Sequence, residues 1–370
     1  MAPTLPDFYG IIPAGGVGSR LWPLSRADAP KFLHDLTGSG QTLLRQTFER
    51  LVPLTGEQRV MVVTGRAHRA AVEGQIPELR DENIVLEADP RDSTVAIALA
   101  AAVLVRRNPD VIIGSFAADH VIHNEAKFRA AIREAVAAAR AGFIATVGIE
   151  PTEPAIGFGY IHCGETAEID DAPSARKVVE FVEKPSLDVA ERYLASGSFM
   201  WNAGMFISRA DVLLAELTKH EPELAASIAQ LADVWDSPTQ RGPAVDRIWP
   251  TLKKIAIDYS VAEHAAASGS LVVVPGAFDW DDVGDFGAIA KLQNGGKGGL
   301  AILGEGATIL ADNSSGVVVS QSKRIISLVG VQDIVVVDTP DALLVTTTAN
   351  AQRVKQVVDA IRLSGNTEVL

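Results

Sequence analysis

The chain has 370 residues, of which 47% are hydrophobic and 21% charged, and its formal net charge at pH 7 is −13. This balance is typical of a folded globular protein with about two domains, and it excludes an intrinsically disordered chain. Because nucleic acids and anionic membranes are bound by basic surfaces, the acidic charge argues against either partner.

Cysteine usage and the N-terminal residues bear on localisation. Cys163 is the only cysteine, which excludes an internal disulfide or a cysteine metal cluster and fits a reducing cytoplasm. Residues Met1–Tyr9 show no basic stretch followed by an apolar core, and no uninterrupted apolar run reaches about 18 residues. We therefore expect a cytoplasmic protein without a secretion signal or a membrane span.

The most specific signal is a glycine-rich segment that follows the apolar pair Ile11-Ile12. Glycines let the backbone approach an anion, and Arg20 and Lys31 supply the positive charge that a triphosphate requires. A P-loop is excluded because no Gly-Lys-Ser/Thr follows, and a dinucleotide fingerprint is disfavoured because Leu21 occupies its third glycine position. The sequence thus predicts a nucleotide-phosphate loop formed by Ala14, Gly15, Gly16, Gly18, Ser19 and Arg20.

Apolar runs then alternate with helix-period segments as far as about residue 150. Strands are expected at 60–64, 111–116 and 144–149, and helices at 42–51, 67–75, 93–107 and 125–141. This series predicts an α/β domain with a doubly wound, mixed but mostly parallel sheet. Ligands bind such sheets at the carboxyl ends of the strands, where the glycine segment lies.

Two acidic segments in this half follow expected strands. Asp92 or Ser93 could cap the helix that begins there. Asp119, at the carboxyl end of the strand at 111–116, is well placed to bind Mg²⁺, although a loop aspartate capping the next turn is the plainer interpretation. His120 is interpreted as positional.

From about 151 to 294 the pattern fits a sugar-binding half. Gly159 precedes a strand and permits close backbone approach, although a plain hairpin explains it nearly as well. Glu183 and Lys184 end another strand and could meet sugar hydroxyls and a phosphate, with a solvated charge pair as the alternative. Asn202 offers a donor and an acceptor, and Asp258 could bind sugar, cap the helix to Ala267, or do both.

An acidic turn closes this half. Residues 279–285 contain four aspartates in seven positions, a density that favours a bound cation, although a merely solvated turn stays possible. The glycine-rich run 295–299 is a linker by composition. Beyond it, short strands at 316–319, 325–329, 334–337 and 343–346 and a helix at 350–363 predict a small stacked or helical β domain over 300–370 that serves assembly or packing.

The segment Ala14–Arg26, followed by Pro30-Lys31, resembles the signature of the sugar-1-phosphate nucleotidylyltransferases. Its Leu-Trp-Pro-Leu-Ser-Arg continuation resembles the mannose-1-phosphate guanylyltransferases, or GDP-mannose pyrophosphorylases. The chain departs from the family pattern at Phe32, where glutamine is usual, at residues 88 and 93–95, and at Asp281, where a neutral residue is usual. Segments around residues 92, 119, 159, 183, 202, 258 and 282 resemble further family motifs in the same order, and the C-terminal strands resemble the family's β-helix-like domain.

The resemblance implies transfer of GMP from GTP to mannose 1-phosphate, which gives GDP-mannose and pyrophosphate, and we expect the enzyme to be a homodimer. It implies that Arg20 and the loop amides hold the β and γ phosphates and that Lys31 neutralises charge at the reacting centre. Asp119 and Asp282 would bind Mg²⁺, Arg91, Asp92 and Ser93 would lie on the guanine side, and the sugar phosphate would be placed by Gly159, Glu183, Lys184, Asn202 and Asp258.

No general base is needed, because a sugar phosphate is mostly ionised at neutral pH, with a second pKa of about 6. The enzyme's task is to align two anions and to stabilise charge on the leaving pyrophosphate. Two alternatives stay open: a thymidylyl- or uridylyltransferase acting on glucose 1-phosphate, and a non-catalytic regulatory paralogue that binds nucleotide sugars.

Overall fold

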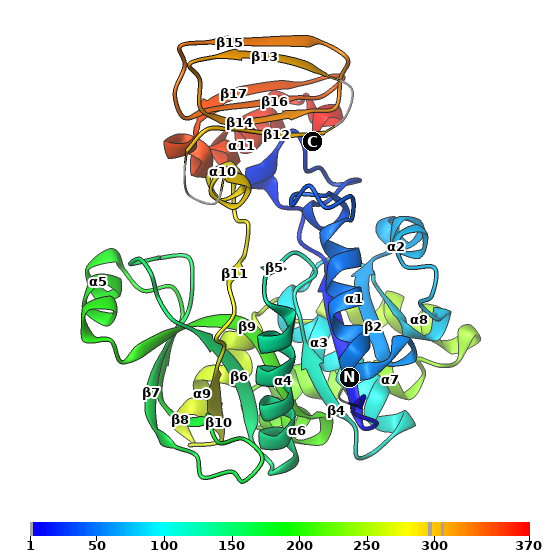
Figure 1. Ribbon diagram of the computed structural model, residues 1–370. Coiled ribbons are helices and arrows are strands. Elements are labelled where there is room, and N and C mark those ends of the chain that lie inside the picture. Colours follow the sequence, from blue (N-terminus) through cyan, green and yellow to red (C-terminus); the bar gives the residue numbers. More distant parts are fainter. Residues whose placement is uncertain (1–2, 295–297, 305–306) are drawn as a thin grey trace.

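The computed structural model describes residues 3–294, 298–304 and 307–370, and it shows a large α/β body joined to a smaller β body (Figure 1). The large body is built on a nine-stranded sheet of order β3-β2-β1-β4-β9-β6-β10-β8-β7. Its strands are β1 Phe8–Ala14, β2 Val60–Gly65, β3 Ile84–Glu87, β4 Ile112–Ser115, β6 Ile144–Ile149, β7 Tyr160–Thr166, β8 Arg176–Val182, β9 Phe199–Arg209 and β10 Leu271–Pro275.

The sheet is mixed, as the sequence predicts, but its strand pairings are not mostly parallel: four are parallel and five are antiparallel. Strands β3, β2, β1 and β4 are parallel to one another, and β9 and β8 run against their neighbours. The parallel strands place their carboxyl ends at one edge, where the glycine segment leaves β1.

Helices cover both faces of the sheet, which explains why its central strands are continuous apolar runs. In β1, Ile11 packs into the core that contains α3, α6 and α7, whereas Phe8 and Ile12 pack into the core that contains α1 and α4. The helices are α1 Leu43–Thr55, α2 Arg69–Gln75, α3 Asp92–Arg107, α4 Glu125–Arg140, α5 Leu187–Ser196, α6 Ala210–His220, α7 Pro222–Asp233, α8 Pro238–Ile248, α9 Glu263–Ala267 and α10 Phe286–Asn294.

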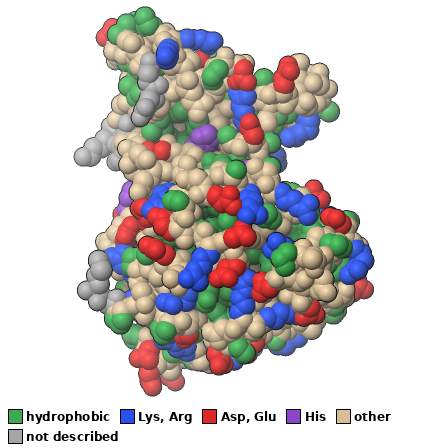
Figure 2. All heavy atoms as spheres, turned by 90° about the vertical axis from the view of Figure 1, so that its right-hand side faces the viewer, with side chains coloured by type: hydrophobic (Ala, Val, Ile, Leu, Met, Phe, Trp, Pro, Cys, Tyr) green, Lys and Arg blue, Asp and Glu red, His purple; other side chains and the backbone are tan. Residues whose placement is uncertain are grey.

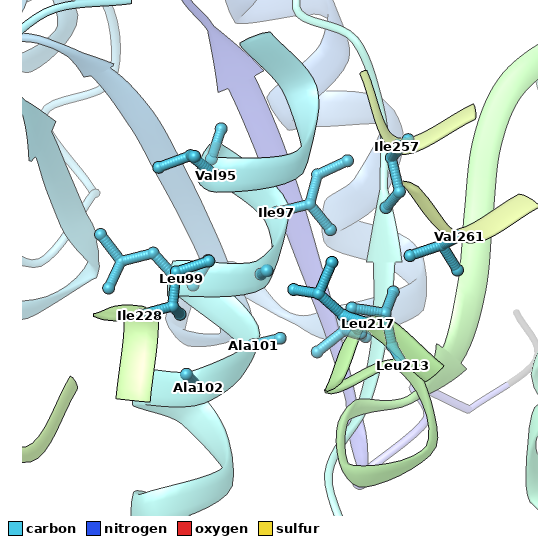
Figure 3. Close-up of a cluster of buried hydrophobic side chains, with 14 of the residues drawn as sticks. Val95, Ile97, Leu99, Ala101, Ala102, Leu213, Leu217, Ile228, Ile257 and Val261 are labelled. Carbon is cyan, nitrogen blue, oxygen red and sulfur yellow. The ribbon is translucent and has the colours of Figure 1, made fainter. Parts of the chain in front are cut away.

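Helix α3 is apolar on every side because it is enclosed. All its residues from Thr94 to Leu104 are buried, and its alanines allow α6 and α7 to pack closely. Figure 3 shows Leu213 and Leu217 of α6 and Ile228 of α7 converging on this helix. The predicted strands and helices of this half are confirmed, with shifts of a few residues at their ends.

A short antiparallel ribbon connects two distant segments. Strand β5, Val121–Ile122, pairs with β11, Trp280–Asp281, so that Val121 lies opposite Asp281. The pairing brings the residues just before β5 next to those just after β11. It therefore joins the two acidic segments that the sequence separates by more than 150 residues.

The smaller body is the predicted β-rich domain. One sheet contains β12 Leu300–Leu303, β14 Gly316–Ser320, β16 Ile334–Asp338 and β17 Leu343–Thr347, and a second contains β13 Thr308–Asp312 and β15 Ile325–Val329. Helix α11, Val354–Ser364, follows. The first sheet packs on α10, α11 and the signature residues Leu21, Trp22 and Leu24. Residues 295–297 of the predicted linker lie outside the described residues, so its boundary at 295–299 stays a prediction.

Two surface observations complete the fold. Within the described ranges, no helix is long and apolar enough to cross a membrane. Figure 2 shows acidic and basic side chains interspersed over the face of the large body that carries α2 and α8, rather than gathered by charge.

Candidate active site

The glycine segment forms a tight loop over Lys31. Gly18 has a φ of +74°, and a Cβ placed on it would lie 2.7 Å from the Cβ of Lys31. The backbone N–H of Lys31 donates to the carbonyl oxygen of Val17 at 3.2 Å, and the buried Ser25 hydroxyl donates to the same carbonyl. Only glycine fits this position, because it combines positive φ with the absence of a side chain.

Lys31 joins the loop to both predicted metal ligands. It begins the short 3₁₀ turn Lys31–Leu33 and is only 6% exposed. Its Nζ donates to Asp119 Oδ2 at 2.8 Å and also to the backbone carbonyl of Asp282. The structure thus brings together a cation from the N-terminal segment and two acidic segments that are far apart in the sequence.

The two aspartates respond differently to this lysine. Burial favours the neutral form of Asp119, but the charge and hydrogen bond of Lys31 outweigh it and lower the pKa of that carboxyl. At Asp282 burial prevails over the attraction of Lys31 and raises the pKa. Asp281 stands where the family usually has a neutral residue. It accepts a hydrogen bond from the Val283 N–H at 2.6 Å and so helps to shape the turn.

The donor set fits a divalent cation that shares its ligands with a substrate. Among the described residues, no group of three or more His, Cys, Asp or Glu could hold a metal by itself. Mg²⁺ is commonly bound by one or two carboxylates together with substrate phosphates, and it prefers oxygen ligands. The carboxylates of Asp119 and Asp282, beside the glycine loop, would provide that incomplete set.

Arg20 lies beside Asp282. It belongs to the 3₁₀ turn Ser19–Leu21, and a Cβ on Gly284 would lie 3.5 Å from its Nη1 and 3.3 Å from Asp282 Oδ1. The guanidinium therefore lies close to the second acid. His120 is half-buried with its ring edge-on to Trp280, 5.3 Å between centroids, and desolvation lowers its pKa to about 4, which agrees with a positional role.

The predicted sugar-side residues converge around Asn202. Its Oδ1 accepts from the Thr146 hydroxyl at 2.9 Å, and its Nδ2 donates to Asp258 Oδ1 at 2.9 Å. Its backbone N–H donates to the carbonyl of Gly159 at 2.8 Å. These bonds fix the amide, because only one orientation of its oxygen and nitrogen satisfies both partners.

Two further residues complete this cluster. Lys184 Nζ donates to Glu183 Oε1 at 2.6 Å, and a Cβ on Gly159 would lie 2.6 Å from Glu183 Oε2. Burial and the charge of Glu183 raise the pKa of Asp258 to about 6. The expectation that Asp258 caps a helix is wrong: a π-helical turn, Asp258–Ala262, begins after Ile257 without a side-chain cap, because the carboxyl turns toward Asn202.

The residues predicted on the guanine side separate into two groups. Arg91 donates to the carbonyl of Leu252 at 3.2 Å, and the Ser93 hydroxyl accepts from the N–H of Ile257 at 2.9 Å. Both contacts tie the start of α3 to the segment 252–257. Asp92 is exposed and accepts from the Ser93 N–H at 2.8 Å, but Arg91 holds the cap position, so the prediction that Asp92 or Ser93 caps α3 is wrong.

Glu87 is a residue that the sequence interpretation missed. It is the last residue of β3, it is buried, and its Oε1 has no hydrogen-bond partner. A Cβ on Gly15 would lie 3.2 Å from its Oε2, which places the carboxyl against the glycine loop. Burial, helped by the charge of Asp92, raises its pKa to about 7. An acid at the carboxyl end of a parallel strand was the signal that could have identified it.

Comparisons with known proteins agree with this geometry. The Nucleotidyl transferase family profile matches residues 9–296, and the profile of the MannoseP isomerase/GMP-like beta-helix domain matches residues 307–361. A mannose-1-phosphate guanylyltransferase of Escherichia coli K12 is 37% identical over 97% of this chain and 74% of its own length. ManC, a mannose-1-phosphate guanylyltransferase of Salmonella typhimurium LT2, is 36% identical over 97% of this chain and 74% of its own.

A solved structure extends the likeness to the fold. A protein of Thermus thermophilus, described as a mannose-1-phosphate geranyltransferase, superposes with a TM-score of 0.83 at 30% identity. The match covers 96% of this chain and 99% of the other. With both domains matched in order, the chain belongs to the nucleotidyl transferase family and, within it, to the mannose-1-phosphate guanylyltransferases.

Proposed function

We propose that this enzyme transfers GMP from GTP to mannose 1-phosphate and releases GDP-mannose and pyrophosphate. The observation that carries the proposal is the meeting of Lys31, Asp119 and Asp282 beside the glycine loop, in a chain of this family. A phosphate oxygen of mannose 1-phosphate forms a bond to the α-phosphorus of GTP. The bond from that phosphorus to the bridging oxygen breaks, and the electron pair leaves with pyrophosphate.

The phosphate side is assigned to groups that carry positive charge or donate hydrogen bonds. The backbone N–H groups of the loop from Ala14 to Ser19, together with Arg20, meet the β and γ phosphates. Lys31 meets the charge around the reacting centre. Asp119 and Asp282 would hold Mg²⁺, which would supply positive charge that lowers the repulsion between the two substrates.

The residues that would recognise guanine and mannose are assigned from the hydrogen-bond donors and acceptors that the structure places there. The carboxylate of Glu87, buried and without a partner at Oε1, matches the N–H donors on one edge of guanine, with Asp92 nearby. Asn202, Asp258, Glu183 and the Gly159 backbone are assigned to the mannosyl hydroxyls, and Lys184 to the sugar phosphate.

The direct test is pyrophosphate release with each nucleoside triphosphate crossed against mannose 1-phosphate and glucose 1-phosphate, with and without Mg²⁺. GTP with mannose 1-phosphate and Mg²⁺ should give the highest kcat/KM. A preference for dTTP or UTP with glucose 1-phosphate would instead support the other nucleotidylyltransferase activity. Nucleotide-sugar binding with no turnover in any combination would support a regulatory paralogue.

We also propose a cytoplasmic homodimer. The outer face of the β13–β15 sheet exposes Leu310, Ile325 and Val329 at 56%, 69% and 73%, an apolar area that a second copy could cover. The single cysteine fits a reducing compartment. Light scattering after size exclusion tests the assembly: a mass of two chains is expected, and a monomer at micromolar concentration would contradict it.

A further inference from the structure

The phosphate-loop arginine is held by a residue of the C-terminal domain. Arg20 Nη1 donates to Gln352 Oε1 at 3.0 Å, across 332 positions of sequence. Gln352 lies in the 3₁₀ turn Thr348–Arg353, between β17 and α11. Arg20 is an exposed side chain with many rotamers, so a fixed partner restricts where its guanidinium can lie.

The orientation of the Gln352 amide is set from its other side. Gln352 Nε2 donates to Asp285 Oδ2. Asp285 is itself fixed, because its Oδ1 accepts from the backbone N–H groups of Gly287 at 2.7 Å and Ala288 at 3.1 Å, at the start of α10. A guanidinium only donates and a carboxylate only accepts, so an amide between them satisfies both in a single orientation.

Gln352 is neutral, so it holds Arg20 without cancelling the positive charge of the guanidinium. Arg26, in the same signature segment, is neutralised by a bidentate pair with Asp341, including a 2.7 Å bond from Nη1. A carboxylate at position 352 would likewise cancel the charge of Arg20 and compete with phosphate. An amide uses only one of the five N–H donors of the guanidinium and leaves its positive charge available to an anion.

The C-terminal domain is attached without the help of Gln352. The Trp22 indole N–H donates to the carbonyl of Val369 at 2.7 Å, and the Ala27 N–H donates to that of Leu370 at 3.3 Å. Apolar side chains of the signature segment and of the small domain also share one core. Removal of the exposed Gln352 amide should therefore leave the two bodies in contact.

We propose that Gln352 is a positioning residue for Arg20, through which the C-terminal domain contributes to nucleotide binding. This inference rests on the proposed function, in which Arg20 meets the β and γ phosphates of GTP. Gln352 itself touches no substrate. It holds the guanidinium at the loop, so that less conformational freedom is lost when GTP binds.

The test is a double-mutant cycle on GTP affinity, measured by calorimetry with Mg²⁺ present. Gln352→Ala should weaken GTP binding about fivefold, the scale of one neutral hydrogen bond, without changing the thermal unfolding temperature. In an Arg20→Ala background the same substitution should have no further effect. Gln352→Glu should weaken binding more than Gln352→Ala, and more strongly at low salt.

A matched control is Gln332→Ala. Gln332 is also exposed and uses both ends of its amide, accepting from the Ser315 hydroxyl and donating to the carbonyl of Asn313, but entirely within the C-terminal domain. The Gln332→Ala substitution should therefore leave GTP affinity unchanged. The inference is overturned if Gln352→Ala binds GTP as tightly as the wild type does. It is also overturned if Gln352→Ala weakens GTP binding by the same factor in the Arg20→Ala background. If Arg20→Ala itself leaves GTP affinity unchanged, the phosphate assignment of the proposed function fails as well.

Discussion

Replacing Glu87 by glutamine tests two properties of this buried carboxyl. The first is whether its ionisation lowers the free energy of unfolding, and the second is whether it recognises guanine. Burial raises the pKa of Glu87 from the ordinary 4.5 to about 7. Between these two pH values the folded chain keeps a proton that the unfolded chain has lost, so the free energy of unfolding falls as pH rises. The difference in pKa corresponds to about 3 kcal/mol of lost stability above pH 7.

Glutamine has nearly the same shape but does not ionise. Glu87→Gln should therefore exceed the wild type in urea unfolding by less than about 1 kcal/mol at pH 5 and by about 3 kcal/mol at pH 8. The exposed Glu57→Gln is the control and should show no such change between the two pH values. Equal differences at pH 5 and pH 8 would refute the buried, high-pKa assignment.

The same variant should lose nucleotide selectivity, because an ionised carboxylate accepts two guanine N–H donors and an amide cannot. The wild type should prefer GTP to ITP, which lacks the 2-amino group, and Glu87→Gln should raise the KM for GTP about tenfold or more, the scale of a charged hydrogen bond. A stabilised variant with unchanged selectivity would mean that Glu87 does not contact the base.

Four further changes have defined outcomes. Lys31→Ala should lower kcat at least about 100-fold, because it removes the cation between Asp119 and Asp282, and near-normal turnover would refute its role. Gly18→Ala should destabilise the chain by about 1–3 kcal/mol in thermal unfolding, because φ is +74° and the new Cβ would meet Lys31, whereas Gly16→Ala, with nothing within 4 Å, should not. Asn202→Ala should raise the KM for mannose 1-phosphate about tenfold while leaving that for GTP unchanged, and equal changes in both would contradict the sugar-side assignment. The pKa of Asp258 is raised to about 6, so the KM for mannose 1-phosphate should fall as pH rises through 6, where both this carboxylate and the substrate phosphate ionise, and Asp258→Asn should leave only the part of the trend that the substrate causes.

The nucleotide half could be predicted well because its signals are local. Continuous apolar strands, amphipathic helices and the spacing of Gly18, Arg20 and Lys31 each depend on neighbouring residues, and the structure places all three at the loop. Phe32, where the family usually has glutamine, is 2% exposed and packs edge-on against His68, which makes this departure a core residue.

The remaining features depend on long-range pairing that periodicity does not encode. The β5–β11 ribbon has only two residues per strand, too short to give a pattern, yet it determines that Asp119 and Asp282 meet. The caps expected at Ser93 and Asp258 failed for the same reason: the Ser93 hydroxyl accepts from the N–H of Ile257, 164 positions away, and Asp258 bonds to Asn202, across 56 positions. The position of Glu87 at the end of a strand was a signal in the sequence, but its burial beside Gly15 is created only by the fold.

The central claim is that the two aspartates hold one divalent ion beside the glycine loop. Anomalous scattering from crystals grown with Mn²⁺ and GDP-mannose tests it most directly. One strong peak within about 2.5 Å of a carboxylate oxygen of both Asp119 and Asp282, in contact with a phosphate oxygen, is expected. A metal peak elsewhere, with nucleotide bound and these two carboxylates uninvolved, would contradict the assignment.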